Sequence, residues 1–378
     1  MIDGKTPWLT LHVPRPLQSE TPLALLREAR VTSKAHLYVR NNQDLDGSMG
    51  LNRGAEGWRV TLAAAGGSLE LTLPDLRAYP QHETEMVLQC SGNSRGRFGG
   101  VSPVSGSRWQ DGAVANVVFG GALLRDVLGD VLGDVLGDVS RGVAPDPLKG
   151  ARYLTARGAG TVHEDDLPPF ERSVPLADVL DTALLALTLN GEPLPALHGG
   201  PVRLVLPGYY GVNNVKWSTW LSCDAEPTQN LYQTEKYRLP KNPLRPGDPF
   251  EATAENSVPS WRLKLKSLLW QPLVGETLRA GPVALGGVAW NDGRSRVARV
   301  EVSCDCGVNW QGAALDSPES PYAWSAWSLT LPFTPGEHEV WVRATDDQGN
   351  TQPLHPDAGW NPAGYEWSSA ERVRLSVR

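Results

Sequence analysis

The last third of the chain carries the pattern that most restricts its fold. From about Val258 onward, short runs rich in apolar residues alternate with turn residues, without the spacing of a helix. These runs are RLKLKSLLW, PVALGGVAW, RVARVEVSC, SAWSLTL, HEVWVRATD and RVRLSV. Regularly spaced short strands separated by turns are typical of two packed antiparallel sheets. The pattern therefore predicts an immunoglobulin-like β-sandwich.

The preceding residues predict a separate domain of mixed helices and strands. A chain of 378 residues is long enough for two hydrophobic cores. Residues 236–249 are rich in Pro, Lys and Arg, a composition suited to a linker. We therefore predict an α+β protein, with a mixed α/β domain over residues 1–255 and the β-sandwich over residues 256–378.

Local patterns predict the elements of the first domain. Helical spacing is present over residues 21–30, and Pro74 marks the start of a second helix. Strands are expected over residues 36–40, 58–62, 69–73, 85–89 and 202–206. The sequence DVLG begins at Asp126, Asp130 and Asp134, and this four-residue period predicts a surface helix extended by repetition.

Charge and targeting signals narrow the range of partners. The formal net charge of −7 argues against a general nucleic-acid binder, because such a surface repels phosphate. The first residues lack a basic segment followed by an apolar stretch, and no apolar run of the length needed to span a membrane is present. We therefore expect a cytoplasmic protein without a membrane partner.

Tryptophan and cysteine are used unevenly. The chain has 14 tryptophans, most of them in its second half, and we expect them to fill sheet cores and an interface. Four cysteines are too few for a disulfide scaffold. We expect Cys223, Cys304 and Cys306 to be small buried side chains, although a reactive Cys304–Cys306 pair is an alternative.

Cys90 is the best candidate for chemistry. Common metal, haem, phosphate-loop and hydrolase motifs are absent from the sequence. Cys90 follows a strand-like run and opens a polar, glycine-rich loop that contains Arg95 and Arg97. Two nearby arginines would favour the thiolate, which is the form that binds metals. A lone cysteine in a buried strand end is the alternative interpretation.

The loop at residues 88–93, Leu-Gln-Cys-Ser-Gly-Asn, resembles the Leu-Gln-Cys-Ala-Gly-Asn loop of the sulfite oxidase family of molybdenum-cofactor oxidoreductases. Further segments resemble that family in the same order along the chain. They are residues 20–23, 38–41, 112–114, 124–128, 189–195, 198–199, 201–203, 215–217, 289–290, 300–303, 343–346 and 360–361. The resemblance runs from about residue 20 to the end.

The resemblance implies a molybdenum ion bound by Cys90 and by the dithiolene of a molybdopterin. It also implies oxidation of sulfite to sulfate by oxygen-atom transfer, a β-sandwich that forms a homodimer, and electrons passed to an external acceptor such as a cytochrome or oxygen. The cofactor carries the redox chemistry in such proteins. Two alternatives remain open: another oxyanion or sulfoxide substrate, or a cofactor-binding protein that has lost activity.

The resemblance also assigns site residues. On the substrate side it implies Arg40, Arg95, Tyr237 and an arginine of the second domain, Arg294 or, after a shift, Arg296. The residues implied for holding the cofactor are Tyr38, Arg40, Asn41, Asn42, His198, Arg203, Asn213, Asn214, Val215 and Lys216.

Two departures from the family pattern bear on the substrate. Asn42 stands where many relatives have a histidine, and Val118-Phe119 stands where relatives often have Arg-Trp. The second change removes a charge and an indole donor, which we expect to affect the region beside the anion pocket. These changes put the substrate preference in doubt but leave the cofactor assignment intact.

Overall fold

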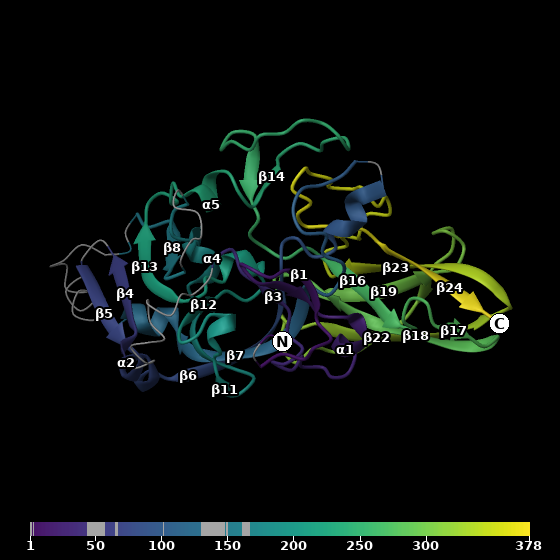
Figure 1. The fold of residues 1–378 in the computed structure, drawn as a ribbon, viewed down its shortest axis with the longest axis horizontal. Helices are drawn as coiled ribbons and strands as arrows, with labels where there is room; N and C mark the ends of the chain where they lie inside the picture. Colours follow the sequence, from purple (N-terminus) through teal and green to yellow (C-terminus); the bar gives the residue numbers. More distant parts are fainter. Residues whose placement is uncertain are drawn as a thin grey trace.

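The structure is a computed structural model that describes residues 2, 4–43, 57–64, 67–100, 102–129, 148, 150–160 and 167–378. The molecule is elongated, with β4, β5, β8 and β13 toward one end, β1 and β3 near the middle and β17 and β24 toward the other end (Figure 1). The N-terminus lies near the middle and the C-terminus at the far tip of the second group. Strands predominate and the described helices are short, in agreement with the predicted class. None of the described helices is long and apolar enough to cross a bilayer.

The first elements form a small antiparallel sheet. It consists of β1 (Thr10–Val13), β2 (Gln18–Glu20) and β3 (Val39–Arg40). The helix predicted over residues 21–30 is only one turn long, α1 (Leu23–Leu26). Leu26 is its one fully buried residue, so a longer helix would gain little from packing. The strand predicted over residues 36–40 is likewise reduced to β3, after which the chain leads directly to Asn41 and Asn42.

A larger sheet carries the loop of Cys90. Its strands are β6 (Gln81–Gln89), β7 (Val114–Leu123), β10 (Leu184–Leu189), β11 (Glu192–Pro193) and β12 (Arg203–Val205). The order is β11-β10-β7-β6, and β12 also pairs with β10. β6 pairs with β7 along its whole length, and the last pair is Gln89 with Val114. Cys90 therefore begins the loop where a rigid strand ends.

A second sheet faces the first. Its strands are β4 (Arg59–Ala64), β5 (Gly67–Thr72), β8 (Tyr153–Gly158), β9 (Glu171–Pro175) and β13 (Ser218–Asp224). They lie in the order β5-β4-β13-β8-β9. Only the pair β13–β4 is parallel. The strands predicted over residues 58–62, 69–73, 85–89 and 202–206 are thus confirmed, with shifted ends.

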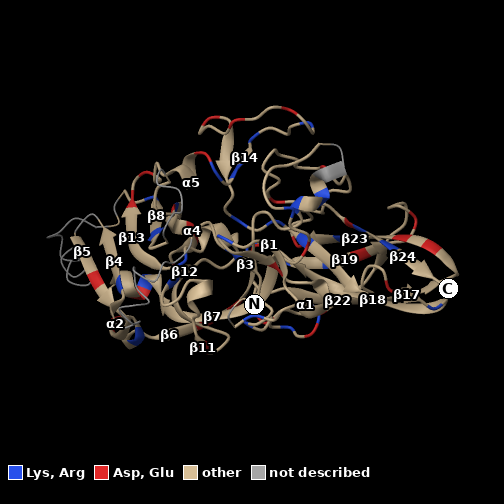
Figure 2. Cartoon of the chain, viewed as in Figure 1, with Lys and Arg blue, Asp and Glu red and all other residues tan. Residues whose placement is uncertain are grey.

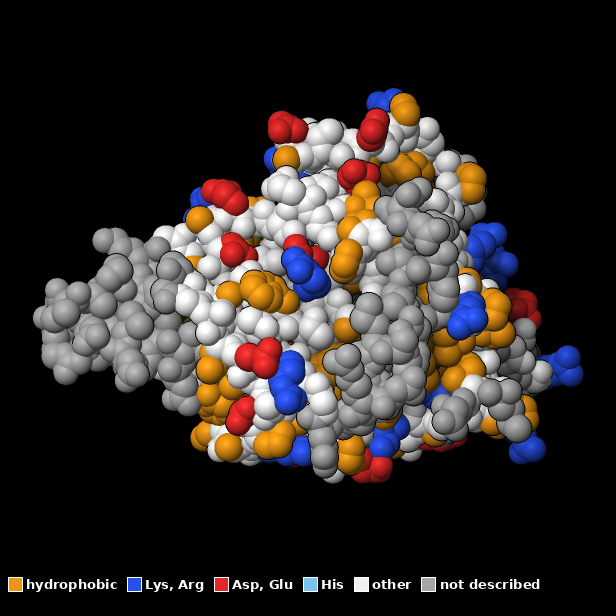
Figure 3. Space-filling view, turned by 60° about the vertical axis from the view of Figure 1, so that its left-hand side comes forward, with side chains coloured by type: hydrophobic (Ala, Val, Ile, Leu, Met, Phe, Trp, Pro, Cys, Tyr) orange, Lys and Arg blue, Asp and Glu red, His pale blue; other side chains and the backbone are white. Residues whose placement is uncertain are grey.

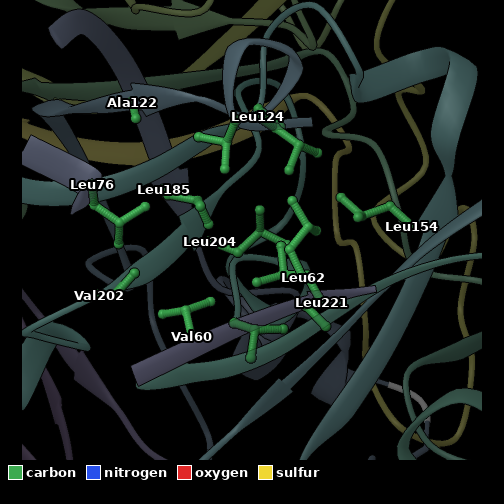
Figure 4. Packing of buried hydrophobic residues seen from close by; sticks show 14 of the residues in the cluster. Val60, Leu62, Leu76, Ala122, Leu124, Leu154, Leu185, Val202, Leu204 and Leu221 are labelled. Carbon is green, nitrogen blue, oxygen red and sulfur yellow. The ribbon is translucent and has the colours of Figure 1, made fainter. Parts of the chain in front are cut away.

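The core of this region lies between the two sheets. Leu185 of β10 and Leu204 of β12 belong to the same buried cluster as Leu62 of β4 and Leu221 of β13 (Figure 4). Burial of each such side chain contributes about 1.5–3 kcal/mol. The packed sheets therefore hold the loops at their ends in fixed positions.

Two short helices flank this core. In α2 (Leu73–Ala78), Thr72 and Asp75 form a reciprocal capping box, and Pro74 lies in the first turn, as predicted. α4 (Leu176–Val179) follows β9. Residues 124–129 are helical, which agrees with a helix at the first DVLG unit. The units at Asp130 and Asp134 lie outside the described residues.

The second half folds into two sheets packed face to face. One has the order β16-β18-β22-β21 and the other β17-β24-β23-β19-β20. The first contains β16 (Lys266–Gln271), β18 (Gly281–Trp290), β21 (Ala314–Leu315) and β22 (Ser325–Phe333). The second contains β17 (Thr277–Leu278), β19 (Val297–Ser303), β20 (Gln311–Gly312), β23 (Gly336–Asp346) and β24 (Glu371–Val377). Apolar side chains of both sheets, such as Leu285 and Val342, form one core. The predicted immunoglobulin-like sandwich is confirmed.

The two halves are joined by paired strands and by an apolar interface. β14 (Arg238–Pro240) pairs with β15 (Ser257–Pro259) across the predicted boundary at residue 255, so the exact boundary stays a prediction. Trp290 and Trp324 of the second half share a buried cluster with Leu26 and Tyr210 of the first. Trp327 lies in the core of the β-sandwich, and Trp290 and Trp324 lie between the two halves of the chain. Tryptophans at a subunit interface stay a prediction.

A buried ion network also crosses this interface. The Arg97 guanidinium lies 2.6 Å from a carboxylate oxygen of Asp111 and 2.9 Å from one of Glu371 in β24. The Lys266 ammonium donates to the Ser94 hydroxyl. Pairing offsets part of the cost of burying these groups, and their contacts connect the Cys90 loop to the β-sandwich.

The cysteines other than Cys90 divide into two kinds. Cys223 in β13 is buried, as expected. Cys304 and Cys306 are exposed, and the expectation of buried side chains is wrong for them. The reason is that β19 ends at Ser303, so both follow the strand in a turn.

Candidate active site

Most of the predicted site residues line one pocket. The pocket lies where the end of β3, the Cys90 loop and the segments on either side of β12 meet. The predicted residues that line it are Tyr38, Arg40, Asn41, Asn42, Cys90, His198, Arg203, Asn214, Lys216 and Tyr237. Residues from five separate parts of the chain therefore converge at one position.

Cys90 is held at the wall of this pocket by its own loop. Its backbone N–H donates to the Ala113 carbonyl at 2.9 Å. The Gly92 N–H points at the Cys90 sulfur, at 3.4 Å, and only 8% of the residue is exposed. No group of three or more His, Cys, Asp and Glu suited to a metal occurs among the described residues. A metal here would have one protein sulfur ligand and would take its other ligands from a cofactor.

The opposite part of the pocket is strongly basic. Arg203 donates to the His198 carbonyl at 2.9 Å, and Lys216 donates to the Asn41 side chain at 2.6 Å. Burial lowers the pKa of Lys216 well below its usual value, and neighbouring Arg203 and Lys5 lower it further. Burial lowers the pKa of Arg203 to about 10. The negative charge of a bound anion would offset the repulsion between these neighbouring basic groups.

Two details of this basic part are consistent with an anionic ligand. The Nε of Arg203 is buried and has no hydrogen-bond partner within the described ranges. No Asp or Glu is found among the described residues lining the pocket. A buried cation without a carboxylate partner is costly unless a ligand supplies the negative charge. The residues therefore fit the phosphate end of a pterin cofactor at His198, Arg203 and Lys216, and a metal at Cys90.

Arg40, Asn42 and Tyr237 form a hydrogen-bonded chain between these two ends. Arg40 donates to the Tyr237 hydroxyl at 3.3 Å, and that hydroxyl donates to the Asn42 side-chain oxygen at 2.8 Å. Burial opposes the charge of Arg40, but the nearby hydroxyl of Tyr237 and sulfur of Cys90 raise its pKa. Arg40 therefore stays a cation in the pocket that Cys90 also lines.

A second pocket adjoins the first, and we call it the vestibule. It shares Arg40, Asn42 and Tyr237 with the first pocket. Its other lining residues are Gln18, Arg95, Ser105, Gly106, Ser107, Leu167, Tyr232, Lys236, Ala363 and Tyr365. Arg95, predicted on the substrate side, lines only the vestibule among the described pockets. It begins the 3₁₀ helix η3 (Arg95–Gly100).

The structure does not bring three predicted residues to either pocket. Arg294 is 55% exposed at its side chain and pairs with Asp178 on the surface, because the loop after β18 turns away from the site. Asn213, in the 3₁₀ helix η5 (Gly211–Asn213), points away and accepts hydrogen bonds from Arg172. Val215 packs into the hydrophobic core. Arg296, the second choice, does not line these pockets either.

Val118 and Phe119 were expected beside the anion pocket, but neither of them lines the first pocket or the vestibule. Phe119 is fully buried, and the Arg203 guanidinium lies 5.4 Å from its ring centroid. The Val118 N–H donates to the Asn190 side chain. Phe119 therefore packs beside the Arg203 guanidinium, and neither Val118 nor Phe119 lines the vestibule.

Sequence reasoning missed two residues that shape the site. Arg172 in β9 is fully buried, its pKa is lowered to about 10 by burial, and its guanidinium lies 5.9 Å from the Tyr237 ring centroid. Tyr365, from the β-sandwich, stacks on Tyr237 with ring centroids 5.1 Å apart. A charge within the strand-like run ERSVP was the one signal for Arg172. Tyr365 gave no local signal.

The positive charge of the site is local. Acidic and basic residues are interspersed over both halves of the chain (Figure 2). One face of the molecule shows charged side chains scattered among uncharged ones (Figure 3). On the face drawn, the coloured basic side chains form no continuous patch.

Comparisons with known proteins agree with this geometry. Residues 48–232 match the family described as oxidoreductase molybdopterin binding domain, and residues 258–377 match the Mo-co oxidoreductase dimerisation domain. The chain is 34% identical to human mitochondrial sulfite oxidase over 98% of its own length and 66% of that protein's. It is 31% identical to chicken sulfite oxidase, covering 95% of this chain and 76% of the relative.

A solved structure supports the same grouping. The sulfane dehydrogenase SoxCD of Paracoccus pantotrophus superposes with a TM-score of 0.74 and 26% identity, covering 98% of this chain and 87% of that one. The shared architecture thus extends over both halves of the chain, as do the sequence matches. The chain belongs to the sulfite oxidase family of molybdenum-cofactor oxidoreductases.

Proposed function

We propose that this protein oxidises sulfite to sulfate and passes the electrons to an external acceptor. The observation that carries the proposal is that the Cys90 sulfur, the Arg40 guanidinium and the Tyr237 hydroxyl line one pocket. A metal-binding sulfur, a permanent cation and a hydrogen-bonding hydroxyl are what a small sulfur oxyanion requires. The overall change is sulfite and water to sulfate, two protons and two electrons.

The cofactor would be held at both ends of the pocket. Cys90 would bind molybdenum, and His198, Arg203 and Lys216 would hold the phosphate end of the pterin. When bound, this group supplies oxygen-atom transfer and two-electron redox chemistry. The protein contributes binding, orientation and charge.

The protein's own residues then act on the anion. Arg40 attracts the sulfite into a buried space where its charge is little screened by water. Tyr237 offers a hydroxyl beside the same guanidinium. Asn42 accepts from that hydroxyl and so holds it in place. An amide here performs the acceptor role that an imidazole would otherwise perform, which favours retained activity over a protein that has lost it.

Oligomeric state and electron acceptor belong to the same proposal. The match of residues 258–377 to a dimerisation domain supports a homodimer. A cytochrome, oxygen or a partner subunit could accept the electrons, and the SoxCD similarity favours a protein partner.

Metal analysis combined with a sulfite-dependent ferricyanide assay tests the proposal. We expect about one molybdenum per chain and turnover of sulfite, both lost in Cys90→Ser. Cys304→Ser is the matched control, because Cys304 is exposed and does not line the pocket, and it should behave as the wild type. A protein produced with ample cofactor that binds molybdenum without oxidising sulfite would refute the activity. A protein that never binds molybdenum would refute the cofactor site.

A further inference from the structure

Tyr237 has a backbone conformation that its residue type disfavours. Its φ of +56° lies in the left-handed region, which residues other than glycine rarely adopt. Such a conformation persists only where the surrounding contacts enforce it. The segment before Tyr237 includes the one-turn helix α5 (Leu231–Thr234), whose first carbonyl accepts from the Lys236 N–H at 3.1 Å. The Ser260 N–H, just after β15, donates to the Tyr237 carbonyl at 2.8 Å. The position of the Tyr237 hydroxyl therefore depends on how α5 and Ser260 are held.

Arg172 of β9 contacts both of these segments. One guanidinium nitrogen donates to the Tyr232 carbonyl in α5, and another lies 3.5 Å from the Ser260 carbonyl. Two further contacts of the guanidinium, at 3.0 and 3.3 Å, reach the Asn213 side-chain oxygen. The Asn213 amide nitrogen in turn donates to the Ser260 carbonyl at 2.9 Å. One arginine thus connects the chain before Tyr237 to the residue that binds the Tyr237 carbonyl.

The charge of Arg172 is not explained by packing. The residue is 1% exposed. Burial lowers its pKa to about 10, and the groups whose charges act on it are Tyr237, Arg238 and Tyr365, none of which is a carboxylate. A buried cation without a carboxylate is costly, and an apolar side chain of similar length would avoid that cost. The guanidinium instead lies 5.9 Å from the centroid of the Tyr237 ring, within reach of a cation–π attraction. The contact with Tyr237 therefore accounts for a cation at this position.

We propose that Arg172 is a positioning residue for Tyr237: it holds the strained segment so that the hydroxyl stays between Arg40 and Asn42. Arg172 lines neither the first pocket nor the vestibule, so it acts through Tyr237 and does not touch the substrate. The proposal rests on the proposed function, because the position of the hydroxyl is measured through sulfite oxidation. It makes β9, which contributes none of the described lining residues, part of the catalytic arrangement.

A double-mutant cycle with Tyr237→Phe tests the proposal. Arg172→Met removes the charge and the donors, and we expect it to lower the kcat for sulfite about tenfold, the contribution of one hydrogen bond from a charged group. The KM for sulfite should change little, because Arg40 remains in place. In the Tyr237→Phe protein, Arg172→Met should lower kcat no further, because no hydroxyl is left to position. Arg172→Lys should restore part of the kcat, since it keeps a cation and a donor.

Hydrogen exchange followed by mass spectrometry gives a readout that does not depend on turnover. In Arg172→Met, peptides that contain the Lys236 and Ser260 amides should exchange about tenfold faster, because the contacts that hold these segments are lost. The molybdenum content should match that of the wild type. Arg152→Met is the matched control, because Arg152 also donates to a backbone carbonyl, that of Ala225, but its side chain is 60% exposed and lines neither pocket. It should keep the wild-type kcat and exchange rates.

A wild-type kcat in Arg172→Met would overturn the role of Arg172 and leave the proposed function standing. An equal fold loss of kcat with and without the Tyr237→Phe change would also overturn it, because Arg172 would then act independently of the hydroxyl. If Arg172→Met does not fold, the same cycle with Arg172→Lys decides between these outcomes. If the molybdenum-loaded wild type does not oxidise sulfite, the proposed function is wrong. Hydrogen exchange then decides alone: faster exchange at both amides supports the role of Arg172, and unchanged exchange overturns it.

Discussion

The Lys5 ammonium nitrogen lies 2.6 Å from Nε2 of His198, although 193 positions separate them in the chain. Lys5 also donates to the Leu37 carbonyl at 2.6 Å. Burial lowers the pKa of Lys5 to about 7. In its protonated form Lys5 can only donate, so Nε2 of His198 accepts and the ring proton lies on Nδ1. The N-terminal segment thus sets the tautomer of a residue that lines the cofactor pocket.

Replacement of Lys5 by methionine should weaken cofactor retention. Methionine keeps the apolar bulk but removes the donor, so His198 is no longer held in one tautomer. We expect the molybdenum and pterin contents after gel filtration to indicate about tenfold weaker binding, the contribution of one hydrogen bond from a charged group. Lys241→Met serves as the exposed control. Unchanged cofactor content in Lys5→Met would show that the contact is dispensable.

Tyr237→Phe should impair turnover without loss of cofactor. The change removes the hydroxyl that accepts from Arg40 and donates to Asn42, while the ring can still stack on Tyr365. Loss of one oriented hydrogen-bond donor lowers kcat by about a hundredfold in other enzymes. Sulfite kinetics and molybdenum content measured on the same preparation distinguish this from misfolding. Full activity would exclude a role for the hydroxyl.

Arg294→Ala should have little effect. The Arg294 side chain is 55% exposed and its partner Asp178 is already bound by Arg262. Exposed ion pairs contribute about 0–1 kcal/mol, so the sulfite kcat/KM should stay close to the wild-type value. A large loss of kcat/KM would show that Arg294 does act in the active site.

Gly364→Ala should disturb the vestibule. Gly364 has a φ of +61°, and an added Cβ would meet the Arg95 side chain at 2.5 Å. Gly359→Ala is the matched control, since Gly359 has a φ of +76° and an added Cβ would meet nothing within 4 Å. Both variants carry backbone strain of about 1–2 kcal/mol, measurable as a lower Tm. Only Gly364→Ala should also lower the kcat/KM for sulfite, because only this added methyl group displaces the Arg95 side chain.

Glu371→Gln should remove a pH dependence of stability. Burial, with Asp111 sharing the same Arg97, raises the pKa of Glu371 from 4.5 to about 7. The folded protein then binds more protons than the unfolded chain between about pH 4.5 and 7, so wild-type stability falls as the pH rises through that window. The effect amounts to about 3 kcal/mol. Thermal unfolding at both ends of the window should show the wild-type Tm falling relative to that of the variant. If the Tm of the wild type and that of Glu371→Gln changed equally with pH, the raised pKa of Glu371 would be contradicted.

The sequence was sufficient for residues whose role depends on position along one segment. Cys90 ends a strand and opens a glycine-containing loop, and both properties are local. The sandwich could be predicted because alternation of apolar residues follows from the pleat of a strand. His198, Arg203 and Lys216 belong to one continuous stretch, so the family resemblance located them together in the pocket.

Residues placed by tertiary packing could not be predicted in this way. Asn213 and Val215 are neighbours of the pocket residue Asn214, but the 3₁₀ turn at Gly211–Asn213 directs their side chains elsewhere. Arg172 and Tyr365 reach Tyr237 from β9 and from the β-sandwich, respectively. The family resemblance implies Arg294 as the arginine of the second domain, whereas the loop after β18 places this side chain at the surface.

The segment that carries Tyr365 belongs to the β-sandwich, yet it closes the wall of a space beside Cys90. Ala363 and Tyr365 border the vestibule, whereas the described lining of the cofactor pocket comes from the front half of the chain. Mutations in the sandwich can therefore alter which molecule enters while the cofactor remains bound as before. Over evolutionary time, substrate range can diverge in the half of the protein that matches a dimerisation domain, and exchanging that half between relatives would transplant selectivity along with subunit pairing.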